Sequence, residues 1–181
     1  MKKFVSRERS LVNVSPEHID ITDDTGENQY LIFLLDGHLY GTPLLSVREI
    51  ILPQEYNHVP NTSDYILGMI NLRGKILSVI DLRIRFKLNP SQSRYNALLV
   101  FENSAGTFAA LVDRVVEVAY ISEDLISSDA PVSLSIPASW RSGVGKYKEK
   151  LITLLQLDQA MIGEEIFDLD QSRLNSDQSI R

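Results

Sequence analysis

One stretch of sixteen residues, NLRGKILSVIDLRIRF at 71–86, constrains the fold more than any other part of the chain. Its middle is a near-continuous run of apolar, mostly branched residues, which is typical of a strand buried on both faces or inside a closed barrel. Gly74 precedes this run and marks a tight turn or bulge. Asp81 follows it, where a carboxylate can cap a helix by accepting hydrogen bonds from backbone amides two or three residues further on. The stretch therefore predicts a turn, a buried strand and the start of a short helix.

The same stretch holds three arginines with different expected roles. Beyond Asp81, helical spacing places Leu82 and Phe86 on one face, so we expect Arg83 and Arg85 to lie on the solvated face. An arginine is almost never fully buried unless it is paired. The guanidinium of Arg73, in the predicted turn, is therefore expected either in solvent or against a specific carboxylate.

The two halves of the chain repeat each other. Residues 68–82 overlie residues 143–157 without a gap at a constant offset of 75, and residues 39–50 overlie residues 107–118 at an offset of 68. Short apolar patterns match easily by chance, so coincidence is the alternative explanation. A true duplication predicts two copies of a five-stranded unit, and hence an all-β fold of two small barrels that share a core.

The duplication also makes two specific equivalences. The offset of 75 places Ile76 on Leu151, and we expect both to occupy buried strand positions. The offset of 68 places Glu49 on Glu117. Glu49 lies among apolar residues of a predicted strand, close enough in the expected fold to pair with Arg73 across the first barrel.

Apolar runs bounded by turn signals predict the remaining elements. Asp36 and Gly37 form a strong hairpin signal. We expect a helical turn around 65–67, a long polar loop over 122–142 and a helix over 157–167. The predicted strands lie at 29–35, at 39–42, around 47–51, at 97–101, 107–112 and 115–121, and as a pair within 146–155.

Charge and polarity suggest how the chain is divided. Residues 1–27 carry 4 basic and 6 acidic residues, residues 28–157 carry 12 of each, and residues 158–181 carry 2 and 6. We expect a tail at 1–27, a folded region at 28–167 with an approximate subdomain boundary at the polar break 89–95, and a second tail at 168–181. Termini without apolar periodicity are commonly mobile, so both tails should be dispensable for folding.

Composition excludes several classes of function. A neutral folded region offers no basic field to attract a phosphate backbone, which argues against nucleic acid as the main partner. No apolar run approaches the ~20 residues of a membrane span, and charged residues interrupt the N-terminus where a secretory signal would be. The chain has no cysteine, which excludes disulfides and thiolate sites. We therefore expect a cytoplasmic protein without direct membrane insertion.

No constellation of residues predicts catalysis, a metal or a cofactor. His18, His38 and His58 lack a second ligand at metal spacing, and we expect all three in solvent. The run Gly143-Val-Gly-Lys146 lacks the full spacing of a phosphate loop and fits a strand turn better. No serine lies in a nucleophile-elbow context. The sequence therefore favours a binding protein over an enzyme.

A family resemblance agrees with these expectations. The segment GMINLRGKILSVIDLR at 68–83, ending at Phe86, resembles the signature of the CheW family, the adaptor proteins of bacterial chemosensory arrays. The resemblance extends over roughly residues 28–163. One departure is Ser78, where the family usually has proline. Further matching positions are Tyr40-Gly41, Val47-x-Glu49-Ile50, Pro60 and Leu111-Val-Asp113-x-Val115.

The resemblance implies a fold, partners and a site. It implies two SH3-like five-stranded β-barrels with short helices, and a non-enzymatic role in coupling chemoreceptors to a CheA-type histidine kinase. The groove between the barrels would bind the cytoplasmic tip of the receptor, and the barrel ends would contact the regulatory domain of the kinase. The residues implied for this partner-binding site are Val47, Glu49, Asn71 and Arg73.

Two other readings of the sequence stay open. For Glu49 and Arg73, the alternative to a partner site is an ordinary surface ion pair, worth about 0 to 1 kcal/mol. For the whole chain, the alternative is a β-barrel module that binds nucleic acid or another ligand through exposed aromatic residues. Phe33, Tyr40, Phe101 and Phe108 fall within apolar runs, which predicts that they belong to the core instead.

Overall fold

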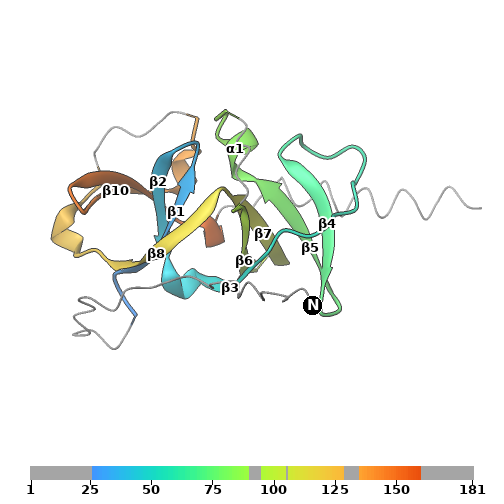
Figure 1. The fold of residues 1–181 in the computed structure, drawn as a ribbon, viewed down its shortest axis with the longest axis horizontal. Helices are drawn as coiled ribbons and strands as arrows, with labels where there is room; N and C mark the ends of the chain where they lie inside the picture. The colour runs from blue at the N-terminus through green and yellow to red at the C-terminus, as the bar shows by residue number, and fades with distance from the viewer. Residues whose placement is uncertain (1–25, 90–94, 105, 129–134, 160–181) are drawn as a thin grey trace, which may run out of the picture.

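The computed structural model describes residues 26–89, 95–104, 106–128 and 135–159 (Figure 1). These residues form mainly strands, joined by tight turns and single helical turns. No helix in this part of the chain is long and apolar enough to cross a membrane. The strands are β1 (Gln29–Leu35), β2 (His38–Pro43), β3 (Val47–Ile51), β4 (Ile66–Leu72), β5 (Lys75–Asp81), β6 (Ala97–Asn103), β7 (Gly106–Val112), β8 (Arg114–Tyr120), β9 (Ile126–Ser127), β10 (Arg141–Tyr147) and β11 (Lys150–Leu155). The helical turns are α1 (Leu82–Arg85), η1 (Leu44–Ser46), η2 (Glu123–Leu125), η3 (Ala138–Trp140) and η4 (Leu157–Gln159).

The strands form two sheets that lie side by side (Figure 1). Sheet A has the order β8-β1-β2-β11-β10-β9, and sheet B has the order β3-β6-β7-β5-β4. The pairs β2–β11 and β5–β7 are parallel, and the other named pairs are antiparallel. The predicted all-β architecture of two SH3-like units with short helices is confirmed. Backbone pairing does not close either sheet into a complete barrel, and sheet A gains the short sixth strand β9.

The predicted subdomain boundary at 89–95 does not separate the two sheets. Strands β5 and β6, on either side of this segment, both belong to sheet B. The chain crosses between sheets at η1 and again at Asp113, so sheet A is built from β1 and β2 together with the strands after residue 113. The prediction was wrong because a polar break marks a surface connection, whereas the partner of a strand is set by long-range pairing.

The internal repeat is structural. Ser78 of β5 lies opposite Phe108 of β7, and the positions related to them by the offsets of 75 and 68, Thr153 and Tyr40, lie opposite each other in sheet A. The corresponding strands therefore follow the same order, β3-β6-β7-β5-β4 and β8-β1-β2-β11-β10. Even the bulges repeat, because the pairing register shifts next to Gly68 and next to Gly143. Chance similarity does not produce matching registers, so the two units are duplicates in geometry.

Ile76 and Leu151 occupy equivalent positions, but the prediction that they are buried is wrong. Their side chains are 61% and 74% exposed, while the following residues Leu77 and Ile152 are 2% and 1% exposed. Both residues lie second in a strand that leaves a tight turn. Side chains alternate between the faces of a strand, so a near-continuous apolar run does not reveal which of its members face solvent.

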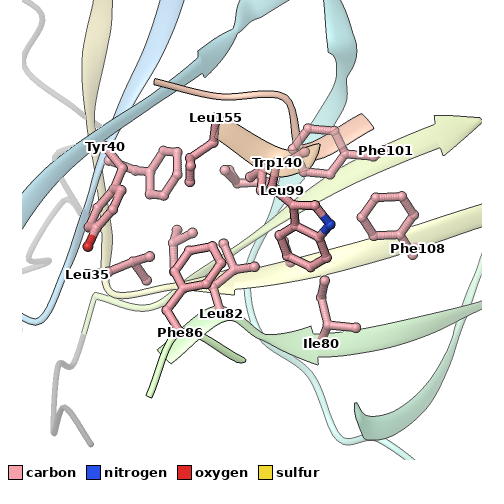
Figure 2. Packing of buried hydrophobic residues seen from close by; sticks show 14 of the residues in the cluster. Leu35, Tyr40, Ile80, Leu82, Phe86, Leu99, Phe101, Phe108, Trp140 and Leu155 are labelled. Atoms are coloured by element: carbon pink, nitrogen blue, oxygen red, sulfur yellow. The ribbon is translucent and has the colours of Figure 1, made fainter. Parts of the chain in front are cut away.

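A shared core lies between the sheets and contains the largest aromatic side chains (Figure 2). Phe33 stacks on Tyr40, Tyr40 lies beside Phe86, and Phe86 meets the edge of Trp140, with ring centroids 5.8 to 6.2 Å apart. These rings come from β1, β2, the end of α1 and η3, so segments distant in sequence depend on one another. Two smaller clusters lie within the individual sheets, around Leu77 and Val100 in sheet B and around Ile32 and Ile152 in sheet A.

The expectation that Arg83 and Arg85 are solvated is also wrong. Arg83 is 6% exposed and forms 2.9 Å ion pairs with Asp81 and Asp113. The guanidinium of Arg85 lies 5.0 Å from the ring centre of Tyr65 and 5.1 Å from that of Trp140. Asp81 does cap α1 as predicted, by accepting from the amides of residues 83 and 84. Because α1 is a single turn at the junction of the sheets, it turns both arginines toward neighbouring segments, and Ile84 is its exposed residue, at 44%.

Other predicted elements have mixed outcomes. The segment 65–67 is not a helical turn, because Ile66 already begins β4. The predicted loop over 122–142 contains η2, β9 and η3 in its described parts, and it contributes Ile136 and Trp140 to the core. The predicted helix over 157–167 begins as η4, and its remainder lies outside the described residues. Both predicted tails lie almost wholly outside them as well.

The first prediction concerns the corrected core positions. Leu77→Ala and Ile152→Ala should each lower the free energy of unfolding by about 2 to 5 kcal/mol, because each leaves a cavity inside its sheet. Ile76→Ala and Leu151→Ala are the matched controls and should change it by less than about 0.5 kcal/mol. Urea unfolding of the four variants measures this. If Ile76→Ala costs as much stability as Leu77→Ala, and Leu151→Ala as much as Ile152→Ala, the observed alternation of buried and exposed positions is contradicted.

The second prediction concerns the buried arginine. Arg83→Ala should cost about 3 to 5 kcal/mol, because it leaves the carboxylates of Asp81 and Asp113 buried without their cation. Arg48→Ala is the control, since Arg48 forms a surface pair with Glu102 at 3.5 Å and should cost less than about 1 kcal/mol. Urea unfolding measures these costs from the shift in the midpoint, provided that the dependence of the free energy of unfolding on urea concentration is unchanged. If Arg83→Ala lowers the free energy of unfolding by no more than the control does, the network does not stabilise the fold.

Candidate functional site

The β4–β5 turn carries two of the predicted site residues. Arg73 and Gly74 form its centre, with φ values of 51° and 87°, so both adopt the left-handed conformation of a two-residue hairpin turn. The Asn71 side chain accepts a hydrogen bond from the amide of Gly74 at 2.8 Å. Asn71 therefore fixes the shape of the turn, and this shape directs the Arg73 side chain outward.

Arg73 forms the expected ion pair with Glu49. Its Nη2 lies 3.1 Å from Glu49 Oε2, with the arginine side chain 78% exposed and the glutamate side chain 30% exposed. Glu49 lies on β3 at one edge of sheet B, whereas Arg73 follows β4 at the other edge. The pair therefore spans the gap between the two unpaired edges of the sheet, where backbone hydrogen bonds would close a complete barrel.

Val47 does not join the other three residues. It is half-buried and packs against the shared core, opposite Phe101 of β6. The pairing register shifts between Val47 and Glu49, so the usual rule that residues two apart share one face of a strand is broken here. The structure thus brings Glu49, Asn71 and Arg73 together, whereas Val47, the first residue of β3, packs against the shared core.

The ion pair lies at the rim of a groove, which we call groove B. Its floor includes the buried side chains of Leu77 and Val100. Glu102 Oε2 lies 3.5 Å from Arg48 Nε, and Glu102 Oε1 lies 4.0 Å from Lys75 Nζ. The groove therefore combines an apolar floor with a charged rim. The residues that line groove B are Arg48, Glu49, Leu72, Arg73, Lys75, Leu77, Val100, Glu102 and Thr107.

Sheet A carries a second copy of this ion pair, which the sequence analysis missed. Lys148 Nζ lies 2.8 and 3.1 Å from the two carboxylate oxygens of Glu117. Lys148 and Glu149 have φ values of 43° and 61°, so they form the same kind of turn between β10 and β11. The two offsets of the repeat relate Lys148 to Arg73 and Glu117 to Glu49. The signal was therefore present, because combining both offsets identifies this pair from the sequence.

The second pair also borders a groove, which we call groove A, between the β1–β2 turn and the β10–β11 turn. The ammonium of Lys148 lies 5.1 Å from the ring centre of Tyr147. Its hydrogen bonds hold the pKa of the Glu117 carboxyl below its usual range, and the carboxylate raises the pKa of Lys148. The two grooves are therefore related in position but present different cations, a guanidinium in one and an ammonium in the other. Groove A is lined by Leu34, Gly37, His38, Leu39, Arg114, Val116, Glu117, Tyr147, Lys148, Lys150 and Leu151.

The other candidate residues show no grouping suited to chemistry. Within the described ranges, no three histidine or acidic side chains are placed to hold a metal ion. His38 and His58 are exposed as expected, and His18 lies outside the described residues. Residues 143–146 form part of β10. The arrangement can thus offer shaped, charged surfaces to a partner.

Comparison with known proteins agrees with this geometry. A family model described as the CheW-like domain matches residues 29–165. The chain belongs to the CheW family. The chemotaxis protein CheW of Helicobacter pylori is 31% identical over 134 residues, which cover 74% of this chain and 81% of that protein. The CheW of Klebsiella aerogenes is 26% identical over 151 residues, covering 83% of this chain and 91% of its own.

A solved structure shows the same fold. The crystal structure of the scaffolding protein TtCheW from Thermoanaerobacter tengcongensis superposes with a TM-score of 0.69 at 30% sequence identity. The match covers 76% of this chain and 90% of that one. CheW proteins are non-enzymatic scaffolds or adaptors in chemotaxis signalling, and membership of the family confirms the prediction that this chain is not an enzyme.

The third prediction concerns the ion pair of groove A. Lys148→Met removes two hydrogen bonds from Glu117, so the pKa of Glu117 should rise toward its usual value of 4.5. A carboxyl whose pKa is lowered by folding stabilises the fold above its unfolded pKa, and this contribution is lost as the pH falls through the folded value. The stability advantage of the unmodified protein over the variant should therefore be present at neutral pH and shrink below 4.5.

Carboxyl NMR titration and urea unfolding at several pH values measure the two effects. Lys146→Met is the control, because Lys146 pairs with the exposed Glu149 at 3.0 Å and leaves Glu117 untouched. An unchanged Glu117 pKa in the Lys148 variant would show that the pair does not persist in solution.

Proposed function

We propose that this protein couples chemoreceptors to a CheA-type histidine kinase by binding the cytoplasmic receptor tip and the regulatory domain of the kinase. Membership of the CheW family supports the general role. One observation supports the site: the Arg73–Glu49 pair is held in an exposed turn at the rim of groove B. The protein would act in the cytoplasm, at receptor arrays that it reaches through its partners.

The geometry of Arg73 suits a partner-binding anchor. A guanidinium has five N–H donors, and the contact with Glu49 uses one of its terminal nitrogens. The left-handed turn fixes the backbone beneath the side chain, so little conformational freedom remains to be lost there on binding. Interface energy concentrates in arginine and aromatic anchors of this kind. In this proposal Glu49 orients Arg73, Asn71 holds the turn and Val47 supports β3.

The two partners would use different surfaces. A receptor tip is a helical hairpin, and an amphipathic helix binds by laying its apolar face into a groove. The kinase regulatory domain is related to CheW itself, so the ends of the sheets would contact corresponding ends of that domain. We assign Val47, Glu49, Asn71 and Arg73 to the receptor-facing site.

The alternative of a nucleic-acid or ligand-binding barrel gains no support from the four aromatic residues predicted to be core. Stacking platforms need exposed aromatic rings on adjacent strands. Phe33, Tyr40, Phe101 and Phe108 are all at most 6% exposed and belong to the shared core. These four rings therefore cannot stack on a base.

The fourth prediction tests the anchor. Arg73→Ala should change the free energy of unfolding by less than about 1 kcal/mol, since the pair is exposed. The same variant should weaken binding to a receptor-tip fragment by about 1 to 3 kcal/mol, or about 5- to 150-fold. Arg73→Lys should restore little of this affinity, because an ammonium lacks the planar geometry of the guanidinium. Calorimetry with the receptor-tip fragment and with the kinase regulatory domain measures both interactions.

Lys146→Ala serves as the matched control, as it removes another exposed, ion-paired cation beside a β-turn, in sheet A. It should leave receptor binding unchanged. If Arg73→Ala binds both partners with unaltered affinity, the anchor role is wrong. A large loss of stability would instead place Arg73 in the framework of sheet B.

A further inference from the structure

Groove B is chemically suited to an acidic peptide that carries apolar side chains. Its rim has three cationic side chains, Arg48, Arg73 and Lys75, against the carboxylates of Glu49 and Glu102. These cations are 63%, 78% and 71% exposed, so all three remain accessible to another anion. The floor adds apolar surface from Leu77 and Val100. A ligand with several carboxylates and a few apolar anchors would therefore match both the rim and the floor.

The described part of the chain ends close to this groove. The backbone carbonyl of Asp158 accepts a 2.7 Å hydrogen bond from the Asn103 side chain. Asn103 ends β6 directly after Glu102, which lines groove B. Groove A lies at the opposite end of β11 from Asp158, because its residues Lys150 and Leu151 begin that strand, whereas η4 follows the strand's last residue, Leu155.

The sequence that follows has the composition that groove B fits. Residues 164–170 read EEIFDLD, four carboxylates interleaved with isoleucine, phenylalanine and leucine. From Gln159, the five residues up to position 164 can span up to about 17 Å, and the eleven up to position 170 about 36 Å. Groove B is therefore within reach of this segment without any change in the described fold.

We propose that residues 164–170 bind in groove B of the same molecule and compete there with the external partner. The carboxylates would replace or share the contacts that Glu49 and Glu102 make with the three cations, and the apolar side chains would cover the floor. The binding of the segment to the groove is inferred from the opposite charges of the two, the apolar floor and the length of the connecting chain. The competition with a partner rests on the proposed function of Arg73.

A weak contact is sufficient for such regulation. A segment tethered by a few residues has an effective concentration of about 1 mM, so a segment with a dissociation constant of about 1 mM as a free peptide would occupy the groove half of the time. The apparent affinity for a partner falls by the fraction of molecules whose groove is open. Occupancies of about 50 to 90% would thus weaken partner binding by about two- to tenfold.

Paramagnetic NMR on the full chain tests the contact. The protein has no cysteine, so Ser172→Cys provides a single attachment point for a spin label just beyond the segment. The label should broaden the amide resonances of the β4–β5 turn, residues 72–75, more than those of the β10–β11 turn, residues 147–150. The second turn is an internal control, because it has the same geometry and also carries a cation beside groove A.

A variant with Glu164→Gln, Glu165→Gln, Asp168→Asn and Asp170→Asn should lose the selective broadening. Raising the salt concentration to about 0.5 M should reduce it as well, since exposed charges are then screened. Equal broadening at both turns, absence of broadening at residues 72–75, or broadening that persists in the neutralised variant would each overturn the proposed contact.

Calorimetry with the receptor-tip fragment tests the competition separately. The neutralised variant should bind about two- to tenfold more tightly than the unmodified protein. Selective broadening with equal affinities for the two proteins would retain the contact and overturn the competition. If the broadening is present but neither the unmodified protein nor the neutralised variant binds the fragment, the proposed receptor function fails and the contact remains. If the two proteins bind the fragment equally and no broadening is seen, this inference fails and the proposed function remains.

Discussion

The arrangement of the two sheets depends on one buried cation. Arg83 pairs with Asp81, at the end of β5 in sheet B, and with Asp113, where the chain crosses to sheet A. Asp113 also accepts a 2.7 Å hydrogen bond from the amide of Asp36 in the β1–β2 turn of sheet A. Burying three charges costs several kcal/mol for each ion, and only close pairing with good geometry offsets this cost. The network therefore requires one particular relative placement of α1, β5 and the β1–β2 turn.

This network is absent from the other half of the duplication. At the offset of 75, Gln156 and Asp158 stand where Asp81 and Arg83 stand in the first half. The corresponding junction uses the hydrogen bond from Asn103 to the Asp158 carbonyl instead. The two units thus share strand order and register, yet the first junction is held by buried charges and the second by a hydrogen bond between a side chain and the backbone. The two units therefore have the same backbone geometry but different side-chain chemistry, so the ends of the molecule that carry the β4–β5 and β10–β11 turns are unequal.

The unequal ends suggest how one small fold can serve several contacts. In sheet B the Arg73–Glu49 pair bridges the two edges of the sheet, and in sheet A the equivalent Lys148–Glu117 pair joins the edge strand β8 to the β10–β11 turn. These pairs lie on turns of the same shape, anchored by strands that reach into the cores. A charged side chain on a rigid turn is presented to a partner at little entropic cost. A guanidinium favours planar, bidentate recognition, whereas the ammonium of Lys148 acts as a point charge, so the two ends would select different partners.

The sequence by itself determined the class of fold, most strand positions and the Asp81 cap, because these follow from local periodicity, turn chemistry and a repeat that aligns the halves. It offered Glu49 and Arg73 as residues able to pair, and the structure brings them together. It did not determine which apolar residues face inward, so Ile76 was misplaced, since a continuous apolar run carries no alternation to read. Nor did it reveal that Arg83 is buried or that β1 and β2 pair with the strands after residue 113. These features were decided by the tertiary structure, because long-range strand pairing brings together carboxylates and edges that are more than 30 residues apart, and no local pattern records that approach.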